Sequence, residues 1–151
     1  MSDDARVVVD TNLLVRYLTE DDPAKAMAVD ALLKKASRGK IKILLPSVVA
    51  AELVWVLESF YRMSLEQISE LVDAILHTPG IEVQDEAILS AATRLYGQTN
   101  IDFVDAWIIE FAKALGVRKI HTFDTKHFKN TGMEVSHPIY SPPTFPLGRD
   151  R

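Results

Sequence analysis

The sequence predicts an α/β protein, a three-layer α/β/α domain around a central, mainly parallel sheet of about four to five strands. Short apolar runs, typical of buried strands, alternate with longer segments of helical periodicity along the 151 residues. A helix between two strands returns the chain to the same end of the sheet, so successive strands run parallel. We expect one domain over residues 1–136, followed by an irregular tail at 137–151 that holds four of the seven prolines.

Each expected element has a local signal in the sequence. Strands are expected at the apolar segments 6–9, 40–46, 80–84 and 117–123. Helices are expected at the segments 11–20, 21–39, 47–62, 64–76, 85–97 and 102–116. Pro23 suits a first helical turn, Gly39 suits a helix end, and Ser64 and Gln67 have the spacing of a capping box. Ser47 is expected to cap the helix that follows the second strand.

Composition excludes several classes of site. The chain has no cysteine, which excludes disulfides, thiolate zinc sites and cysteine nucleophiles. No apolar run approaches the roughly 18 residues that a membrane span needs. The start of the chain, MSDDARVVVD, is acidic and does not resemble a secretory signal. We therefore expect a cytoplasmic protein that does not enter a membrane.

The net charge does not decide whether the partner is a nucleic acid. A formal charge of −4 speaks superficially against one. However, taking five candidate site acids from the 21 Asp and Glu leaves 16, against 17 Lys and Arg. The surface outside such a site would be nearly neutral.

Two carboxylates follow expected strands directly. Asp10 ends the valine strand RVVV, and Asp124 ends the segment KIHTFD. In open α/β sheets, ligands bind at the carboxyl ends of the strands, so both positions suit a site. Each residue could instead cap the turn or helix that follows, although Thr11 and Asn12 are also competent caps beside Asp10.

Three further acids lie on expected helices. Glu52 has valine and tryptophan neighbours three and four residues away, which predicts an inward position, whereas Glu58 can pair with Arg62 on the surface. A buried ion pair is the alternative for Glu52. Asp105 also faces apolar neighbours, and Asp102 lies three residues before it. Asp102 could instead be the N-cap of that helix, with Asp105 stabilising the first turn.

Taken together, these acids predict a metal site. Burying one uncompensated carboxylate costs several kcal/mol, and a cluster of them also repels itself. All-oxygen ligation suits a hard divalent cation, Mg²⁺ or Mn²⁺. Such an ion can activate water and stabilise charge on a phosphoryl group. The residues therefore predict metal-assisted hydrolysis of phosphodiesters or phosphomonoesters.

Four segments in order resemble the PIN-domain ribonucleases, and most closely the VapC toxins of toxin–antitoxin systems. The segments are VVVDTNLLVRYL, LPSVVAAELVWVL, DFVDAWIIEFA and HTFDTKHF. The resemblance implies that Asp10, Glu52, Asp105 and Asp124 are catalytic and bind one or two Mg²⁺ or Mn²⁺ ions, with Asp102 as an additional ligand. It also implies that residues beside them orient the carboxylates. These residues are Thr11, Asn12 and Thr122.

The resemblance also implies a substrate and partners: an endoribonuclease that cleaves tRNA or rRNA, forms a homodimer and is inhibited by a VapB-like antitoxin. RNA binding needs positive charge near the acids, and the basic residues nearest to them in sequence are Arg16, Lys126 and Lys129. The basic stretch KKASRGKIK suits a solvated surface better than an RNA track. The apolar helix face around Val54 and Leu57 could dock a partner helix or belong to the core. The four histidines, including His121 and His127, suit structural positions.

Three other functions compete with this one. A haloacid-dehalogenase-type phosphatase needs a second Asp two residues after the first, where this chain has Asn12. A receiver-like signalling module would want an acid pair near the first strand end. A PIN-fold module that binds RNA or protein without appreciable catalysis has the same sequence pattern, and the loss of metal-dependent cleavage in Asp10→Asn would discriminate against it.

Overall fold

A computed structural model describes residues 5–144 of the chain. Its helices are α1 (Thr11–Thr19), α2 (Pro23–Ser37), α3 (Ser47–Ser59), α4 (Leu65–Leu76), α5 (Glu86–Gln98), α6 (Phe103–Ala114) and the 3₁₀ helix η2 (Thr125–Phe128). Its strands are β1 (Arg6–Val8), β2 (Lys42–Leu45), β3 (Ile81–Val83), β4 (Lys119–His121) and β5 (Glu134–Ser136).

Several helices begin where the capping signals predict. The Ser64 hydroxyl accepts a hydrogen bond from the Gln67 N–H, and the Gln67 side chain accepts one from the Ser64 N–H, which completes the capping box of α4. Pro23 begins α2. Ser47 is the first residue of α3 rather than its cap, because its N–H and hydroxyl both donate to Gln84 Oε1, at 3.0 and 3.2 Å.

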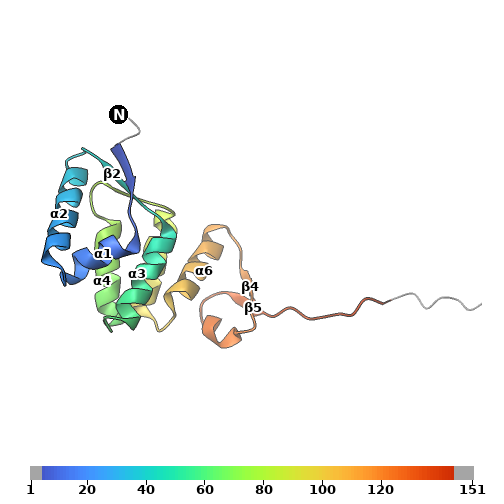
Figure 1. Cartoon of the computed structure of the whole chain (residues 1–151). Helices are drawn as coiled ribbons and strands as arrows, with labels where there is room; N and C mark the ends of the chain where they lie inside the picture. Colours follow the sequence, from blue (N-terminus) through green and yellow to red (C-terminus); the bar gives the residue numbers. More distant parts are fainter. Residues whose placement is uncertain (1–4, 145–151) are drawn as a thin grey trace, which may run out of the picture.

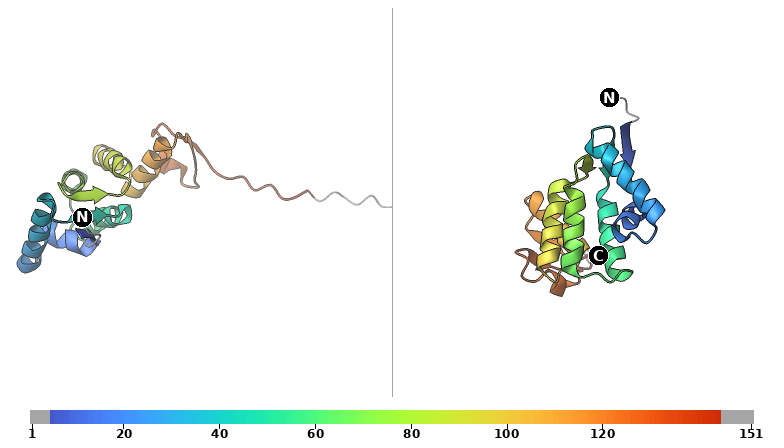
Figure 2. Two further views of the ribbon diagram at one scale, coloured as in Figure 1. Left: turned by 90° about the horizontal axis from the view of Figure 1, so that it is seen from above. Right: turned by 90° about the vertical axis from the view of Figure 1, so that its left-hand side faces the viewer.

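The main sheet has three parallel strands in the order β1–β2–β3. Helices α1 and α2 lie on one side of the strands and α4 and α5 on the other, as Figures 1 and 2 show. Ile43 and Leu45 of β2 are buried, as befits a middle strand between two helical layers. The α/β class is as predicted.

The fourth expected strand does not join this sheet. β4 pairs in parallel with β5, a strand not expected from the sequence, and the two form a separate sheet beyond α6 (Figure 1). The single central sheet of four to five strands is therefore corrected to sheets of three and two strands. In β4 the apolar Ile120 lies between Lys119 and His121, which are exposed. Such a strand lacks the continuous apolar run that a strand covered on both faces requires.

The core is built around α3 and the helices that pack beside it. Val54 and Leu57 are 1% and 0% exposed, so the helix face on which they lie belongs to the core and does not dock a partner. Glu58 does not pair with Arg62 as expected, because its carboxylate accepts a hydrogen bond from the hydroxyl of Tyr96 on α5. Tyr96 is 1% exposed and meets Phe103 of α6 edge-on, with the ring centroids 5.7 Å apart. This contact fixes the first turn of α6 against α3 and α5.

The end of the described chain has no regular structure. Residues 137–144 form no helix or strand and extend away from the body (Figure 1). The rest of the expected tail, 145–151, and the first four residues lie outside the described range. No helix within residues 5–144 has both the length and the apolar character to cross a membrane.

Candidate acidic site

Asp102 and Asp105 lie at the start of α6. Asp102 is the N-cap residue by position, but its side chain makes no capping hydrogen bond, so its carboxylate is available for another role. Asp105 lies in the first turn, and its side chain is 19% exposed, which matches the predicted inward position. The buried Phe103 and Ala106 anchor the turn that carries both acids.

Asp124 comes from the other sheet. It follows β4 and precedes η2, and its own side chain makes no capping hydrogen bond to that 3₁₀ helix. The Asp124 N–H donates a 3.0 Å hydrogen bond to Thr122 Oγ1. Thr122 therefore holds the backbone that carries the Asp124 carboxylate.

His127 connects these acids. Its Nδ1 lies 3.1 Å from Asp124 Oδ2 and 3.4 Å from Asp105 Oδ2. The sequence pattern favoured a structural position for this histidine and gave no indication of its place beside the acids. The available signal was its spacing, since a residue three positions after Asp124 on a 3₁₀ helix returns to the same side.

Asp102, Asp105 and His127 line one pocket, which we call the acidic pocket, whereas Asp124 contacts it only through His127. It has a volume of about 430 Å³ and is lined by Asn100, Ile101, Asp102, Asp105, Lys126, His127 and Lys129. Lys126 and Lys129 were expected as phosphate contacts. The pocket thus combines carboxylates and cationic side chains, which is the combination that a cation and a phosphate backbone would need.

The charges in the acidic pocket act on each other. Burial raises the pKa of Asp105 above its usual range, and the negative charges of Asp102 and Asp124 raise it further, while His127 opposes the shift. Like charges close together resist ionisation, and a bound cation would relieve that repulsion.

Asp10 follows the valine strand as predicted, but its side chain caps the adjacent helix α1. Val9 is 4% exposed, whereas Asp10 emerges at the surface and caps α1 by accepting a 3.1 Å hydrogen bond from the Leu13 N–H. Thr11 is 6% exposed, and Asn12 is exposed. Asp10 is not among the residues that line the acidic pocket.

Glu52 is exposed, which corrects the predicted inward position. The buried stripe of α3 consists of Ala50, Leu53, Val54 and Leu57, a pattern that leaves Glu52 outside. Its apolar neighbours Val48 and Trp55 are themselves 70% and 64% exposed. Apolar neighbours therefore indicated burial wrongly, because α3 is apolar on its exposed face as well.

Arg16 is engaged elsewhere. Its Nη1 lies 3.1 Å from Asp21 Oδ1, which occupies part of the guanidinium expected to contact phosphate. In the basic stretch KKASRGKIK, Lys34 pairs with Asp30 at 2.7 Å and Lys42 with Glu82 at 3.7 Å, as a solvated surface would.

The donor chemistry suits Mg²⁺ or Mn²⁺, but the arrangement assembles only part of a ligand set. The acids of the pocket offer oxygen atoms, and the raised pKa of Asp105 marks a place where positive charge is favoured. Across residues 5–144, however, no three Asp, Glu, His or Cys side chains lie close enough together to hold one metal ion.

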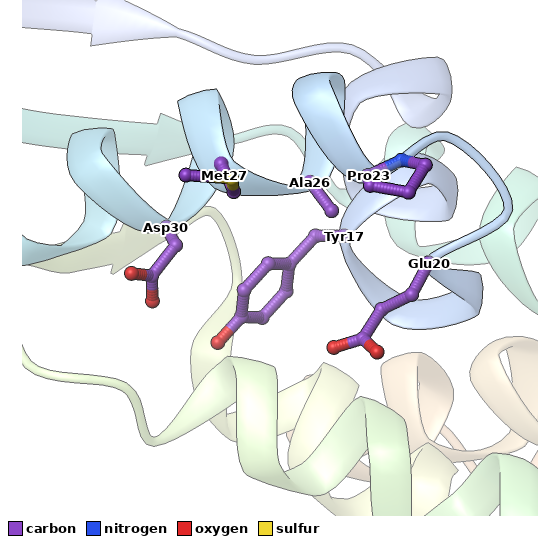
Figure 3. Close-up of a pocket in the computed structure, with 6 residues that line it drawn as sticks. All are labelled: Tyr17, Glu20, Pro23, Ala26, Met27 and Asp30. Atoms are coloured by element: carbon purple, nitrogen blue, oxygen red, sulfur yellow. The ribbon is translucent and has the colours of Figure 1, made fainter.

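A different pocket, of about 360 Å³, lies between α1 and α2. Figure 3 shows the Tyr17 ring between the carboxylates of Glu20 and Asp30, with Met27 above it on α2. None of the predicted site residues lines it. Asp30 is already paired with Lys34, so this pocket offers no cluster of free acids.

Comparison with known proteins decides the family. A PIN domain model matches residues 7–133, which include all the predicted site residues. The chain belongs to the PIN domain family. A curated relative, the VapC ribonuclease of Aquifex aeolicus (strain VF5), is 27% identical over 131 residues, which cover 87% of this chain and 96% of that protein. The resemblance to PIN-domain proteins of the VapC kind is thus confirmed.

Proposed function

We propose that this PIN domain is a metal-dependent endoribonuclease toxin of the VapC kind, which hydrolyses phosphodiester bonds in cellular RNA such as tRNA or rRNA. The observation that carries the proposal is the acidic pocket, where Asp102 and Asp105 meet Lys126 and Lys129. The likeness to a protein named as a VapC ribonuclease supports the choice of RNA as substrate.

The acids of the pocket have the cation-binding role. Asp105 and Asp124, with Asp102 beside them, would hold Mg²⁺ or Mn²⁺, and Asp10 and Glu52 stay proposed ligands on the sequence pattern alone. When bound, the cation supplies activated water and stabilisation of the charge on the phosphoryl group. The proposal includes one or two such ions.

The remaining residues bind and orient. Lys126 and Lys129 would contact the phosphates that flank the scissile bond, because they line the same pocket as the acids. Thr122 would keep Asp124 in place through the backbone hydrogen bond to its hydroxyl.

Cleavage of a mixed tRNA and rRNA pool tests the proposal. The wild type would be assayed with Mg²⁺, with Mn²⁺ and with EDTA, beside Asp10→Asn and Asp105→Asn. Asp73→Asn on α4 is a matched control, since it neutralises an acid whose side chain is 59% exposed and which, among the described residues, pairs with His77 alone. Cleavage that requires metal, persists in the control and disappears in Asp105→Asn would support the proposal.

Two results would contradict it. Equal cleavage by all variants would show a contaminating nuclease or a wrong site. RNA binding without cleavage by the wild type would favour the rival function, a PIN-fold module that binds RNA or protein without catalysis.

The proposed partners include a VapB-like antitoxin and a second copy of the chain, in the cytoplasm. Exposed apolar side chains on and beside α3 support an association surface: Val48, Trp55 and Phe60 are 70%, 64% and 82% exposed. Light scattering at increasing protein concentration would test the homodimer. A Trp55→Ser variant that stays as associated as the wild type would exclude this face as the contact.

A further inference from the structure

His127 contacts acids from two different parts of the fold, helix α6 and the segment between β4 and β5. Asp105 lies on α6, whereas Asp124 and His127 lie between β4 and β5. Among the ion pairs within residues 5–144, the contact of His127 with Asp105 is the one that links α6 to η2. His127 is thus the side chain that contacts both carboxylates.

The geometry gives the two ring nitrogens different roles. Nδ1 lies within 3.4 Å of one carboxylate oxygen from each acid, so a single N–H faces both. This role needs a proton on Nδ1 only, which one neutral tautomer provides. Nε2 has no hydrogen-bond or ion-pair partner among the residues that the structure describes, and the side chain is 60% exposed.

Two carboxylates that repel each other stay close only if another interaction offsets the repulsion. Asp124 and Asp105 come from different elements, and each would lower its energy by moving away from the other. A donor placed between them offsets the repulsion and fixes their separation. Donors of this kind orient the carboxylates of metal sites, and their removal typically costs about 10–100-fold in metal affinity or activity.

We propose that His127 is a positioning residue that holds the Asp105 and Asp124 carboxylates beside each other through Nδ1, so that both can contribute to cation binding. This inference rests on the proposed function, because it concerns the same acids. It adds a residue to which the sequence pattern assigned no part in the site. His127 contacts neither substrate nor scissile bond in this role.

The choice of substitution separates the two nitrogens. In His127→Asn the side-chain amide nitrogen stands near the position of Nδ1, whereas in His127→Gln it stands near the position of Nε2. His127→Ala removes both. His121→Asn is the matched control, since His121 is an exposed histidine at the end of β4 and makes no ion pair within the described residues.

Two readouts are needed. Calorimetry with Mn²⁺ alone measures the affinity of the acids without any turnover. RNA cleavage at saturating Mg²⁺ gives kcat and KM. Thermal unfolding of each variant by circular dichroism shows whether it is folded.

We expect Mn²⁺ affinity and kcat to fall about 10–100-fold in His127→Ala and His127→Gln, with KM for RNA nearly unchanged. His127→Asn should retain both within about threefold, because it keeps the donor, and His121→Asn should match the wild type.

Three results would overturn the inference. A folded His127→Ala with wild-type Mn²⁺ affinity and cleavage would leave the nuclease proposal standing and remove His127 from it. Rescue by Gln rather than Asn would place the required atom at Nε2. A folded wild type that neither binds Mn²⁺ nor cleaves RNA would refute the proposed function, and this inference would fall with it.

Discussion

Tyr96→Phe removes one oxygen atom from the place where three helices meet. The Tyr96 hydroxyl on α5 donates to Glu58 on α3, and its ring packs edge-on against Phe103 on α6. Burial raises the pKa of Tyr96, and the hydrogen bond to Glu58 raises it further, so the hydroxyl stays a donor throughout the ordinary pH range. Phenylalanine keeps the ring and its packing, and the change therefore isolates the hydrogen bond.

The expected loss follows from the burial of this contact. Tyr96 is 1% exposed and Glu58 is half-buried, so water replaces the hydroxyl poorly. A hydrogen bond to a charged group contributes about 1.5–3 kcal/mol. At roughly 2–4 °C per kcal/mol for a domain of this size, Tm should fall by about 3–12 °C.

Tyr61→Phe is the matched control for this measurement. Its hydroxyl also donates to a carboxylate, Asp21 Oδ2 at 3.0 Å, but that side chain is 41% exposed. Thermal unfolding of both variants should show a clearly larger loss for Tyr96→Phe, and a double substitution with Glu58→Gln should lose little more than Tyr96→Phe alone. Equal losses in the two tyrosine variants would refute the argument from burial.

Three other predictions concern the acidic pocket. Asp105→Asn should abolish metal-dependent RNA cleavage. The pKa of Asp105 is raised in the folded protein, so the folded protein binds this proton more tightly than the unfolded chain does. The wild type should therefore lose stability as pH rises from the unfolded to the folded pKa of this group. Urea unfolding across acidic pH should show a smaller loss in the variant. Thr122→Val should reduce cleavage about tenfold without a comparable change in Tm, because it removes only the oxygen that accepts the Asp124 N–H. An unchanged rate would show that this hydrogen bond does not position the acid. Replacing Lys126 and Lys129 together by Ala should weaken binding of single-stranded RNA. The slope of log K against log salt, measured by fluorescence anisotropy, should become less negative by about 1.4. An unchanged slope would place the phosphate contacts elsewhere.

The sequence predicted those features that local chemistry determines. The capping box of Ser64 and Gln67 and the start of α2 at Pro23 need only neighbouring residues, and both are present. The inward position of Asp105 followed from a helix with one dominant apolar side. The six helices and the parallel pairing of the first three strands followed from the alternation of apolar patterns, whereas the predicted number of strands in the sheet did not.

The errors arose where position depends on distant parts of the chain. Glu52 lies on a helix that is apolar around most of its circumference, so its neighbours could not show which face the core would choose. β5 has three residues, too few for a periodic signal, and it pairs with β4 in a register that places Val135 opposite Ile120. His127 reaches Asp105 across 22 positions of sequence, and no local pattern indicates that contact.

Strand β1 is an edge strand, and one of its edges has no hydrogen-bonded neighbouring strand within the described residues. In the described part of the chain β1 pairs with β2 alone, and Arg6 is its one charged residue, so little prevents another strand from adding to the sheet there. Val8 is 67% exposed, and the chain reaches Asp10 two residues later. A parallel strand added to this side would run toward Asp10 and change its surroundings without entering the acidic pocket.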